Sequence, residues 1–298
     1  MKKIAVIGAN SYIARNLLYV LQQQKPDFCV SLYDYAEVQA DHAKNYKQID
    51  ILNPVSVAEI DFNCDIIYMF VGKTGSVNGF DSFDEFIDIN QKALLNVLNE
   101  YRKQESHAKI IFPSTRLVYK GSNFPLKEDA EKEFKTVYAI NKFACEQYLE
   151  QYQNVFGIRY CVFRICVPYG TLIPNASSYG TAEFMLNRAQ KGENISLYGD
   201  GSVRRTITYM GDLCRILIEG ALDDRYLNDI YNIGGEDYSL AEMARLIADK
   251  YHILVEYTAY PALALKIESG STVFDDSTLQ NICAFKYQMS FAAWCKNY

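Results

Sequence analysis

The sequence predicts an α/β fold in which a doubly wound parallel sheet is followed by a smaller C-terminal α/β region. Short apolar runs alternate with longer amphipathic segments over the first 165 residues, which is typical of consecutive βαβ units. The first apolar run ends in a glycine turn that opens a helical pattern. After residue 165 the segments shorten, and Gly, Pro, Ser and Asn cluster at 167–181. We expect a first domain over 1–165 and a second over 166–298, with part of 205–235 returning to the first.

Each strand of the first region is predicted from a short run rich in β-branched or aromatic residues, and each helix from apolar residues recurring at i, i+3 and i+4. In chain order these strands are expected at 4–7, 29–33, 66–71, 109–113 and 159–165, and the helices at 12–23, 84–104 and 136–152. Beyond residue 165, strands are expected at 195–198, 206–209 and 229–233, and helices at 182–191, 211–222 and 239–251.

The composition excludes several classes of protein. Of the 298 residues, 49% are hydrophobic and 22% are charged, as in ordinary globular proteins and unlike disordered or fibrous chains. With 36 acidic against 30 basic residues, the net charge of −6 gives no basic footprint for nucleic acid. No apolar stretch approaches the roughly 18 residues of a membrane span, so we expect neither a nucleic acid nor a membrane as partner.

The cysteines and histidines are scattered along the chain. The eight cysteines form no CxxC pair, and the three histidines lie far apart. In a chain of this size, that pattern predicts reduced thiols, a cytoplasmic location and no metal site. The two lysines near the N-terminus precede a four-residue apolar run, which is shorter than the core of about 7–15 residues in a secretory signal peptide.

A glycine turn follows the first predicted strand. It is a degenerate G-x-x-G-x-x-G pattern, in which Ser11 and Ala14 replace the second and third glycines after Gly8. Gly8 permits a tight turn, and Ala14 is small enough for close packing of helix on strand. The backbone N–H groups at Tyr12 and Ile13 then open a helix whose N-terminus suits a pyrophosphate. An ordinary βα turn would look the same, so the turn alone leaves both interpretations open.

A carboxylate favours the dinucleotide interpretation. Asp34 ends the second predicted strand, 26 residues after Gly8, near the place where a carboxylate accepts hydrogen bonds from an adenosine ribose. A carboxylate there repels a 2′-phosphate, so NAD is expected as cofactor in preference to NADP. A plain turn aspartate is the alternative. Asp50 and Ile51, at the end of a possible third strand, could flank the adenine.

The most specific pair is Tyr138 and Lys142, at the start of a strong helical pattern. Their i, i+4 spacing places the phenol and the ammonium on one helix face. A free tyrosine has a pKa near 10, too high for efficient proton transfer at neutral pH, and a neighbouring cation lowers it. A buried tyrosine beside a surface lysine is the alternative. Thr115 ends the strand before this helix, where it supplies a third polar group.

Taken in order, these motifs resemble those of extended short-chain dehydrogenases/reductases of the NAD-dependent epimerase/dehydratase type, which act on nucleotide sugars and have a Rossmann-type first domain. The likeness covers nearly the whole chain. Its motifs are Gly8, Asp34, 50–51, 70–72, Asn90, 114–119, Tyr138 with Lys142, Arg164 with 168–170, 197–202 with Arg204 and Arg205, and 231–234.

The resemblance implies a role for each matching residue. Thr115 binds the sugar oxygen that undergoes redox, Tyr138 exchanges its proton, and Lys142 lowers the tyrosine pKa and holds the nicotinamide ribose. Arg205 clamps the diphosphate, which suits a guanidinium fork. Cofactor contacts are implied for Gly8, Ser11, Tyr12, Ile13, Asp34, Asp50, Ile51, Val71, Gly72, Asn90, Tyr138 and Lys142, and substrate contacts for Thr115, Arg116, Val167 and Arg205.

Several positions depart from the family pattern. An asparagine that often contacts substrate is Val167 here, and the aspartate usual after the diphosphate arginine is Thr206. Family members that remove water across C5 and C6 carry Asp-Glu directly after the catalytic threonine. This chain has Arg116 and Leu117 there, and a leucine cannot transfer a proton, so 4,6-dehydration is not expected.

Three functions remain open. A 4-epimerase that retains NAD is favoured by Asp34, whereas a reductase of a 4-keto-6-deoxy nucleotide sugar fits Val167 and the compact second domain equally well. A catalytically silent cofactor sensor is disfavoured by the intact set of Thr115, Tyr138 and Lys142. The resemblance also implies a homodimer packed through the helices near 84–104 and 136–152, and a role in making polysaccharide precursors.

Overall fold

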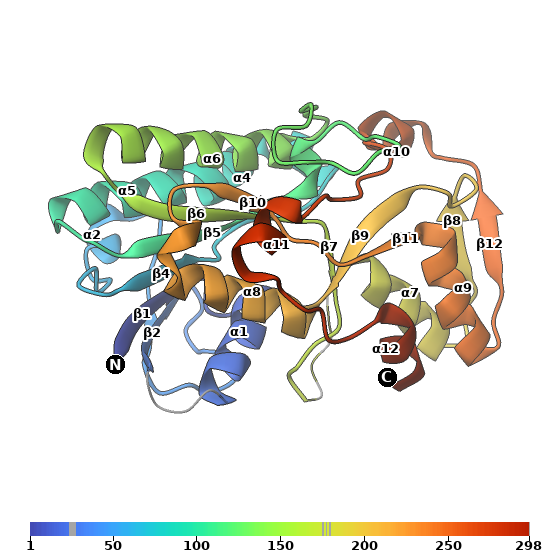
Figure 1. The fold of residues 1–298 in the computed structure, drawn as a ribbon, viewed down its shortest axis with the longest axis horizontal. Helices are drawn as coiled ribbons and strands as arrows, with labels where there is room; N and C mark the ends of the chain where they lie inside the picture. The colour runs from blue at the N-terminus through green and yellow to red at the C-terminus, as the bar shows by residue number, and fades with distance from the viewer. Residues whose placement is uncertain (24–27, 175, 177, 179, 298) are drawn as a thin grey trace.

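The computed structural model describes residues 1–23, 28–174, 176, 178 and 180–297, and it confirms the predicted fold class (Figure 1). Seven parallel strands form the central sheet in the order β10-β6-β5-β4-β1-β2-β3. The chain moves outward from β1 to β3 and then returns to the other side of β1, which is doubly wound topology. The strands are β1 (Lys2–Ile7), β2 (Phe28–Asp34), β3 (Tyr46–Gln48), β4 (Ile66–Met69), β5 (Lys109–Thr115), β6 (Arg159–Ile165) and β10 (Ile230–Asn232).

Helices cover both faces of this sheet because its strands are apolar on both sides. Along β1, Val6 points into one buried cluster and Ile7 into the other, as the two-residue period of a strand requires. One face packs against α1 (Tyr12–Gln23) and α8 (Met210–Leu222), and the other against α5 (Ala93–Lys103) and α6 (Val137–Phe156). Figure 1 shows the two helix layers on opposite sides of the sheet.

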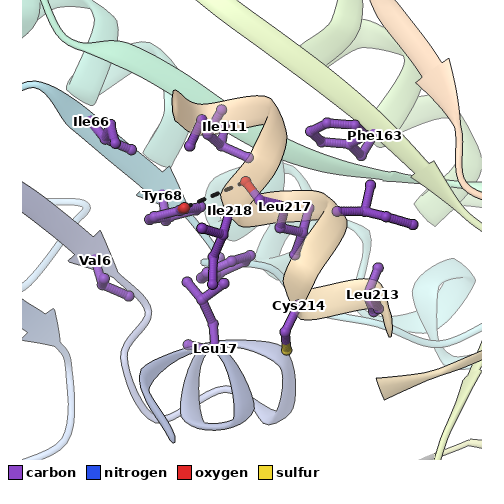
Figure 2. Packing of buried hydrophobic residues seen from close by; sticks show 14 of the residues in the cluster. Val6, Leu17, Ile66, Tyr68, Ile111, Phe163, Leu213, Cys214, Leu217 and Ile218 are labelled. Carbon is purple, nitrogen blue, oxygen red and sulfur yellow. Dashed lines mark hydrogen bonds between the residues drawn. The ribbon is translucent and has the colours of Figure 1, made fainter. Parts of the chain in front are cut away.

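The helix α8 comes from the later part of the chain yet seals the first sheet. Figure 2 shows Leu213, Cys214 and Leu217 of α8 among side chains from the central strands and α1. The Tyr68 hydroxyl donates to the Leu217 carbonyl over 3.4 Å. Burying each leucine or phenylalanine side chain stabilises the folded state by about 1.5–3 kcal/mol, so the apolar packing of α8 holds this helix on the sheet.

A second region with its own small sheets follows β6. One sheet has the order β11-β9-β7, with β9 antiparallel to β11 and parallel to β7, and β8 pairs with β12 in a separate parallel ribbon. The helices α7, α9 and α12 bury apolar side chains against these strands. The elements are β7 (Val167–Tyr169), α7 (Thr181–Gln190), β8 (Ile195–Tyr198), β9 (Arg204–Tyr209), β11 (Glu236–Ser239), α9 (Leu240–Tyr251), β12 (Val255–Thr258) and α12 (Phe291–Asn297).

Some elements differ from the sequence predictions. The helix expected at 84–104 is divided into α4 (Phe83–Ile87), a π-helical turn η1 (Asp88–Lys92) and α5. The possible third strand ends at Gln48, before Asp50 and Ile51. The helix α6 continues four residues past the predicted end, to a left-handed cap at Gly157. The strands β7, β11 and β12 were not predicted.

The remaining elements are short. They are α2 (Pro54–Val57), α3 (Asn78–Asp81), η2 (Arg116–Val118), η3 (Asp224–Tyr226), α10 (Ala262–Ile267) and α11 (Ser277–Cys283). Within the described ranges, no helix combines the length and the apolarity needed to cross a membrane.

Candidate active site

A pocket of about 480 Å³ opens at the carboxyl ends of the central strands. It lies between β1 and β4, where the winding of the sheet reverses, which is where α/β sheets bind their ligands. Besides Tyr138 and Lys142, its walls come mainly from 11–13, 70–72, 74–76, 113–117 and 165–168. A larger hollow of about 710 Å³ beside α1 contains none of the predicted site residues.

The glycine turn forms one wall of this pocket. Gly8 has a φ of +87°, and a β carbon there would lie 2.7 Å from the carbonyl carbon of Phe70, so only glycine fits between β1 and β4. Ser11, Tyr12 and Ile13 line the pocket where α1 begins. The structure therefore brings the N-terminus of a twelve-residue helix to the cavity.

The three predicted adenosine contacts divide into two groups. The Asp34 carboxylate lies beside the glycine turn, where its two oxygens accept from the backbone N–H groups of Asn10 (2.9 Å) and Ala36 (3.3 Å). Asp50 instead accepts from the N–H of Leu52, and the Ile51 side chain is buried in the core. None of Asp34, Asp50 and Ile51 lines the pocket itself, and of the three only Asp34 bonds to the glycine turn.

Val71 and Gly72 line the pocket, whereas Asn90 does not line it but lies next to Gly72. The buried Asn90 amide accepts from the N–H of Lys73 at 2.9 Å and donates to the Lys73 carbonyl at 3.1 Å. This pair of bonds fixes the backbone after β4. Asn90 lies in the π-helical turn η1, and such turns are frequent at functional sites.

Thr115, Tyr138 and Lys142 all line the same pocket. Thr115 ends β5, and its hydroxyl accepts from the N–H of Leu117, which caps η2. Tyr138 and Lys142 lie one turn apart at the start of α6, which begins at a Thr136 cap that bonds the N–H of Ala139. The strand β5 and the helix α6 thus place the predicted catalytic groups together.

Lys142 is buried, with 5% of its surface exposed. Burial lowers the pKa of its ammonium to about 8, although Cys145 and Glu146 nearby act in the opposite direction. Its Nζ lies 4.1 Å from the centre of the Phe112 ring, a cation–π contact that favours the charged form. At pH 7 the side chain is therefore a protonated cation held inside the pocket at a cost.

We expect Lys142→Met to stabilise the cofactor-free protein at pH 7 by about 2 kcal/mol. The lowered pKa corresponds to a burial cost of about 3 kcal/mol, and loss of the Phe112 contact offsets about 1 kcal/mol. Between pH 8 and 10.5 the Lys142 side chain binds more protons in the unfolded chain than in the folded one, so its burial cost falls as pH rises through this range. Urea unfolding of the stripped protein should therefore show that the stability advantage of Lys142→Met over wild type shrinks from pH 8 to pH 10.5. An advantage that stays constant over this range would contradict the assignment.

A buried ionic network supports the pocket from behind, and the sequence reasoning missed it. Arg164 on β6 forms a bidentate pair with Glu146 on α6, with N–O distances of 3.0 and 2.6 Å. Glu146 also accepts from the Ser114 hydroxyl, and Arg164 donates to Tyr119 at 2.6 Å. The only sequence signals were Arg164 in a family motif and the spacing of Glu146 one turn after Lys142.

The predicted substrate contacts take different positions. Arg116 and the buried Val167 line the pocket, whereas Arg205 does not. Arg205 is 2% exposed and pairs with Glu268 at 2.7 Å, and it also donates to the carbonyl of Gly270 at 2.5 Å. The guanidinium expected at a diphosphate thus has a carboxylate partner within the chain.

A comparison with known families decides what kind of protein carries this site. The sequence profile of the NAD dependent epimerase/dehydratase family matches residues 4–234. The chain belongs to this family. The family resemblance expected from the motifs is therefore confirmed, and NAD is the cofactor of this enzyme.

Individual relatives in the epimerase/dehydratase family are distant. The chain is 28% identical over 211 residues to UDP-N-acetyl-alpha-D-glucosaminuronate decarboxylase of Bacillus cytotoxicus, and the alignment covers 68% of this chain and 64% of that protein. It is 26% identical over 199 residues to UDP-glucuronate 4-epimerase of Thermodesulfobacterium geofontis, with coverage of 65% and 59%. The chain thus spans about three fifths of the length of these relatives.

Two solved structures share the fold of this chain. UDP-glucose 4-epimerase from Thermus thermophilus, in complex with NAD, superposes with a TM-score of 0.85 at 19% identity, over 99% of this chain and 96% of that chain. Pal from Bacillus thuringiensis superposes with a TM-score of 0.87 at 20% identity and similar coverage. At these identities the likeness shows the fold.

The residues around the pocket fit an NAD molecule. The N-terminus of α1 offers N–H groups suited to a pyrophosphate, and Asp34 lies beside that turn with a carboxylate suited to ribose hydroxyls. Lys142 lines the same pocket next to Gly72, where an added β carbon would be 3.9 Å from the ammonium nitrogen. The carboxylate of Asp34 suits NAD better than a 2′-phosphorylated dinucleotide.

Proposed function

We propose that this enzyme is an NAD-dependent nucleotide-sugar 4-epimerase. The observation that carries the proposal is the meeting of Thr115, Tyr138 and Lys142 in one pocket at the reversal point of the sheet. The names of several relatives refer to epimerases of nucleotide sugars, including UDP-glucuronate 4-epimerase. We further propose that its product is a precursor of polysaccharides.

The pocket residues divide the work of proton transfer. Tyr138, as the phenolate, accepts the proton of the sugar 4-hydroxyl and returns it at the end of the cycle. The ammonium of Lys142 stabilises the phenolate, and the Thr115 hydroxyl binds the same sugar oxygen and keeps it in place. When bound, NAD supplies the acceptor and donor of the hydride. Epimerisation then requires the 4-keto sugar to present its other face within the pocket.

The residue after Thr115 argues against loss of water from the sugar. Arg116 and Leu117 occupy the positions at which dehydratases resembling this chain carry a carboxylic acid pair. An arginine remains protonated and a leucine has no proton to give, so neither replaces an acid–base pair. The reductase of a 4-keto-6-deoxy nucleotide sugar is the second candidate, because it needs only the three groups already described.

Denaturing the purified protein and identifying any released dinucleotide by mass spectrometry tests the proposal. An epimerase recycles its cofactor, so we expect close to one NAD per chain. An empty protein that binds reduced cofactor selectively would favour the reductase. A protein that binds no dinucleotide would contradict both functions.

We also propose that two copies of the chain associate through α4 and α6. Phe83, Ile87 and Ile140 on these helices are 50%, 42% and 51% exposed, and a second copy packed against them would remove this apolar surface from water. Size-exclusion chromatography coupled to light scattering should give twice the chain mass of 34.1 kDa. A mass equal to one chain would contradict the dimer.

A further inference from the structure

Arg116 brings a positive charge into the pocket next to a catalytic group. It is half-buried, follows Thr115 directly, and begins η2. Its Nη1 reaches the segment 269–272, where it donates to the Ser269 hydroxyl at 3.2 Å and lies 3.5 Å from the Thr272 hydroxyl. Both partners are neutral, so neither compensates the charge.

The other arginines of the chain show that a partly buried guanidinium without a carboxylate partner is uncommon in this protein. Among the described residues, every other buried or half-buried arginine pairs with a carboxylate within 4 Å. These are Arg15, Arg159, Arg164, Arg188, Arg204, Arg205 and Arg215. Arg116 forms no such pair with any described residue. A charge taken partly out of water without a partner is costly, which points to a counter-ion that arrives with a ligand.

The neighbouring arginine leaves Arg116 uncompensated. Arg205 pairs with the carboxylate of Glu268, and its other bonds go to backbone carbonyls of Arg204 and Gly270. Two guanidinium groups therefore share one carboxylate. Burial, with a smaller effect from Arg205, lowers the pKa of Arg116 to about 10, so Arg116 keeps its proton at neutral pH. Arg116, Arg205 and Glu268 together carry a net charge of +1, and of the three only Arg116 lines the pocket.

The place of Arg116 selects the anion. A nucleotide sugar offers anionic oxygens either in its diphosphate or on an acidic sugar. Arg116 and Thr115 line the same pocket, whereas Arg205, the arginine expected at the diphosphate, does not. In the proposed function Thr115 binds the reacting sugar oxygen, so an anion on the sugar ring is the one that shares this pocket with Arg116.

We propose that Arg116 binds a carboxylate on the sugar, so that the substrate is a nucleotide-linked uronic acid. This inference rests on the proposed function and narrows its substrate class. A guanidinium fork binds the two oxygens of a carboxylate with fixed geometry, which would orient the sugar ring against Thr115 and Tyr138. Arg116 is then a specificity-determining residue for the reaction.

Calorimetric titration of the NAD-loaded protein tests this. The nucleotide is chosen first by titrating UDP, dTDP, CDP and GDP, and its glucose and glucuronate esters are then compared. We expect the glucuronate ester to bind at least about 10-fold more tightly than the glucose ester. We expect Arg116→Leu to weaken the glucuronate ester about 10- to 100-fold, the range for a bond to a charged group, and to leave the glucose ester unchanged.

Two further variants complete the experiment. Arg116→Lys should retain part of the preference, since it keeps the charge and loses the fork. Arg159→Leu, which breaks a pair with Asp224 at the opposite end of β6, should bind all ligands as wild type does. An equal loss of the nucleoside diphosphate in Arg116→Leu would assign Arg116 to the diphosphate and overturn the proposal, as would the absence of any uronate preference in wild type. Turnover of a neutral sugar with retained NAD would remove this inference alone, whereas a protein without dinucleotide would remove the proposed function.

Discussion

Tyr138→Phe is expected to lower kcat by about 10²- to 10⁴-fold, the usual contribution of a general acid–base group. The change removes one oxygen from the pocket and leaves Thr115 and Lys142 in place. The ring still fills the same space at the start of α6. We therefore expect the NAD content and the melting temperature to stay near wild type while turnover, followed by NMR of the sugar, falls.

A matched control lies on the same helix. The Tyr152 hydroxyl bonds the Asn99 side chain at 3.2 Å near the surface, so Tyr152→Phe removes the same atom outside the pocket. It should leave kcat unchanged. If Tyr138→Phe also retains full turnover, Tyr138 is not the proton carrier. If neither wild type nor variant converts any nucleotide sugar while both bind NAD, the silent cofactor sensor becomes the better description.

Arg164→Met should lower the free energy of unfolding by about 3–5 kcal/mol, because it leaves a buried carboxylate without its partner. The side chains of Arg164 and Glu146 are 3% and 0% exposed, so water cannot solvate the Glu146 carboxylate when the guanidinium is removed. Burial alone would lower the pKa of Arg164, but the hydrogen bonds to Glu146 and its negative charge outweigh that effect and raise the pKa. Urea unfolding, monitored by circular dichroism, measures the loss.

Two comparisons make this prediction specific. Lys120→Met breaks a surface pair with Glu131, whose side chains are 51% and 70% exposed, and should cost far less than Arg164→Met because water solvates both groups. Adding Glu146→Leu to Arg164→Met removes both charges and should recover part of the stability. If Arg164→Met costs no more than Lys120→Met, the buried pair does not stabilise the fold as described.

The central sheet could be predicted because its strands are short apolar runs that are buried on both faces. The second region resisted prediction for the opposite reason. The strand β11 has the sequence EDYS, which contains no apolar run, and it pairs through its backbone with β9. The π-helical turn at 88–92 accompanies a contact between Asn90 and Lys73, which are 17 residues apart, and helical periodicity does not record such a contact.

The site shows the same division between local and distant information. Spacing along one helix predicted that Tyr138 and Lys142 share a face, and they line one pocket. The partners of Arg205 and Arg116 lie 63 and 153 residues away in sequence, so no local pattern revealed which guanidinium has a carboxylate partner. The motif therefore predicted where Arg205 and Arg116 lie along the chain, but not which residues their guanidinium groups contact in the fold.

The return of α8 and β10 to the first sheet has a consequence for how this enzyme can be divided. A single cut near residue 165 would strip the helix that covers Tyr68 and Phe163 and would leave β6 as a bare edge strand. The unpaired edge of β6 and the apolar sheet face without α8 would promote aggregation. Exchanging the C-terminal region for that of another family member would therefore require at least two separate junctions, so such chimeras are better built by replacing individual pocket segments.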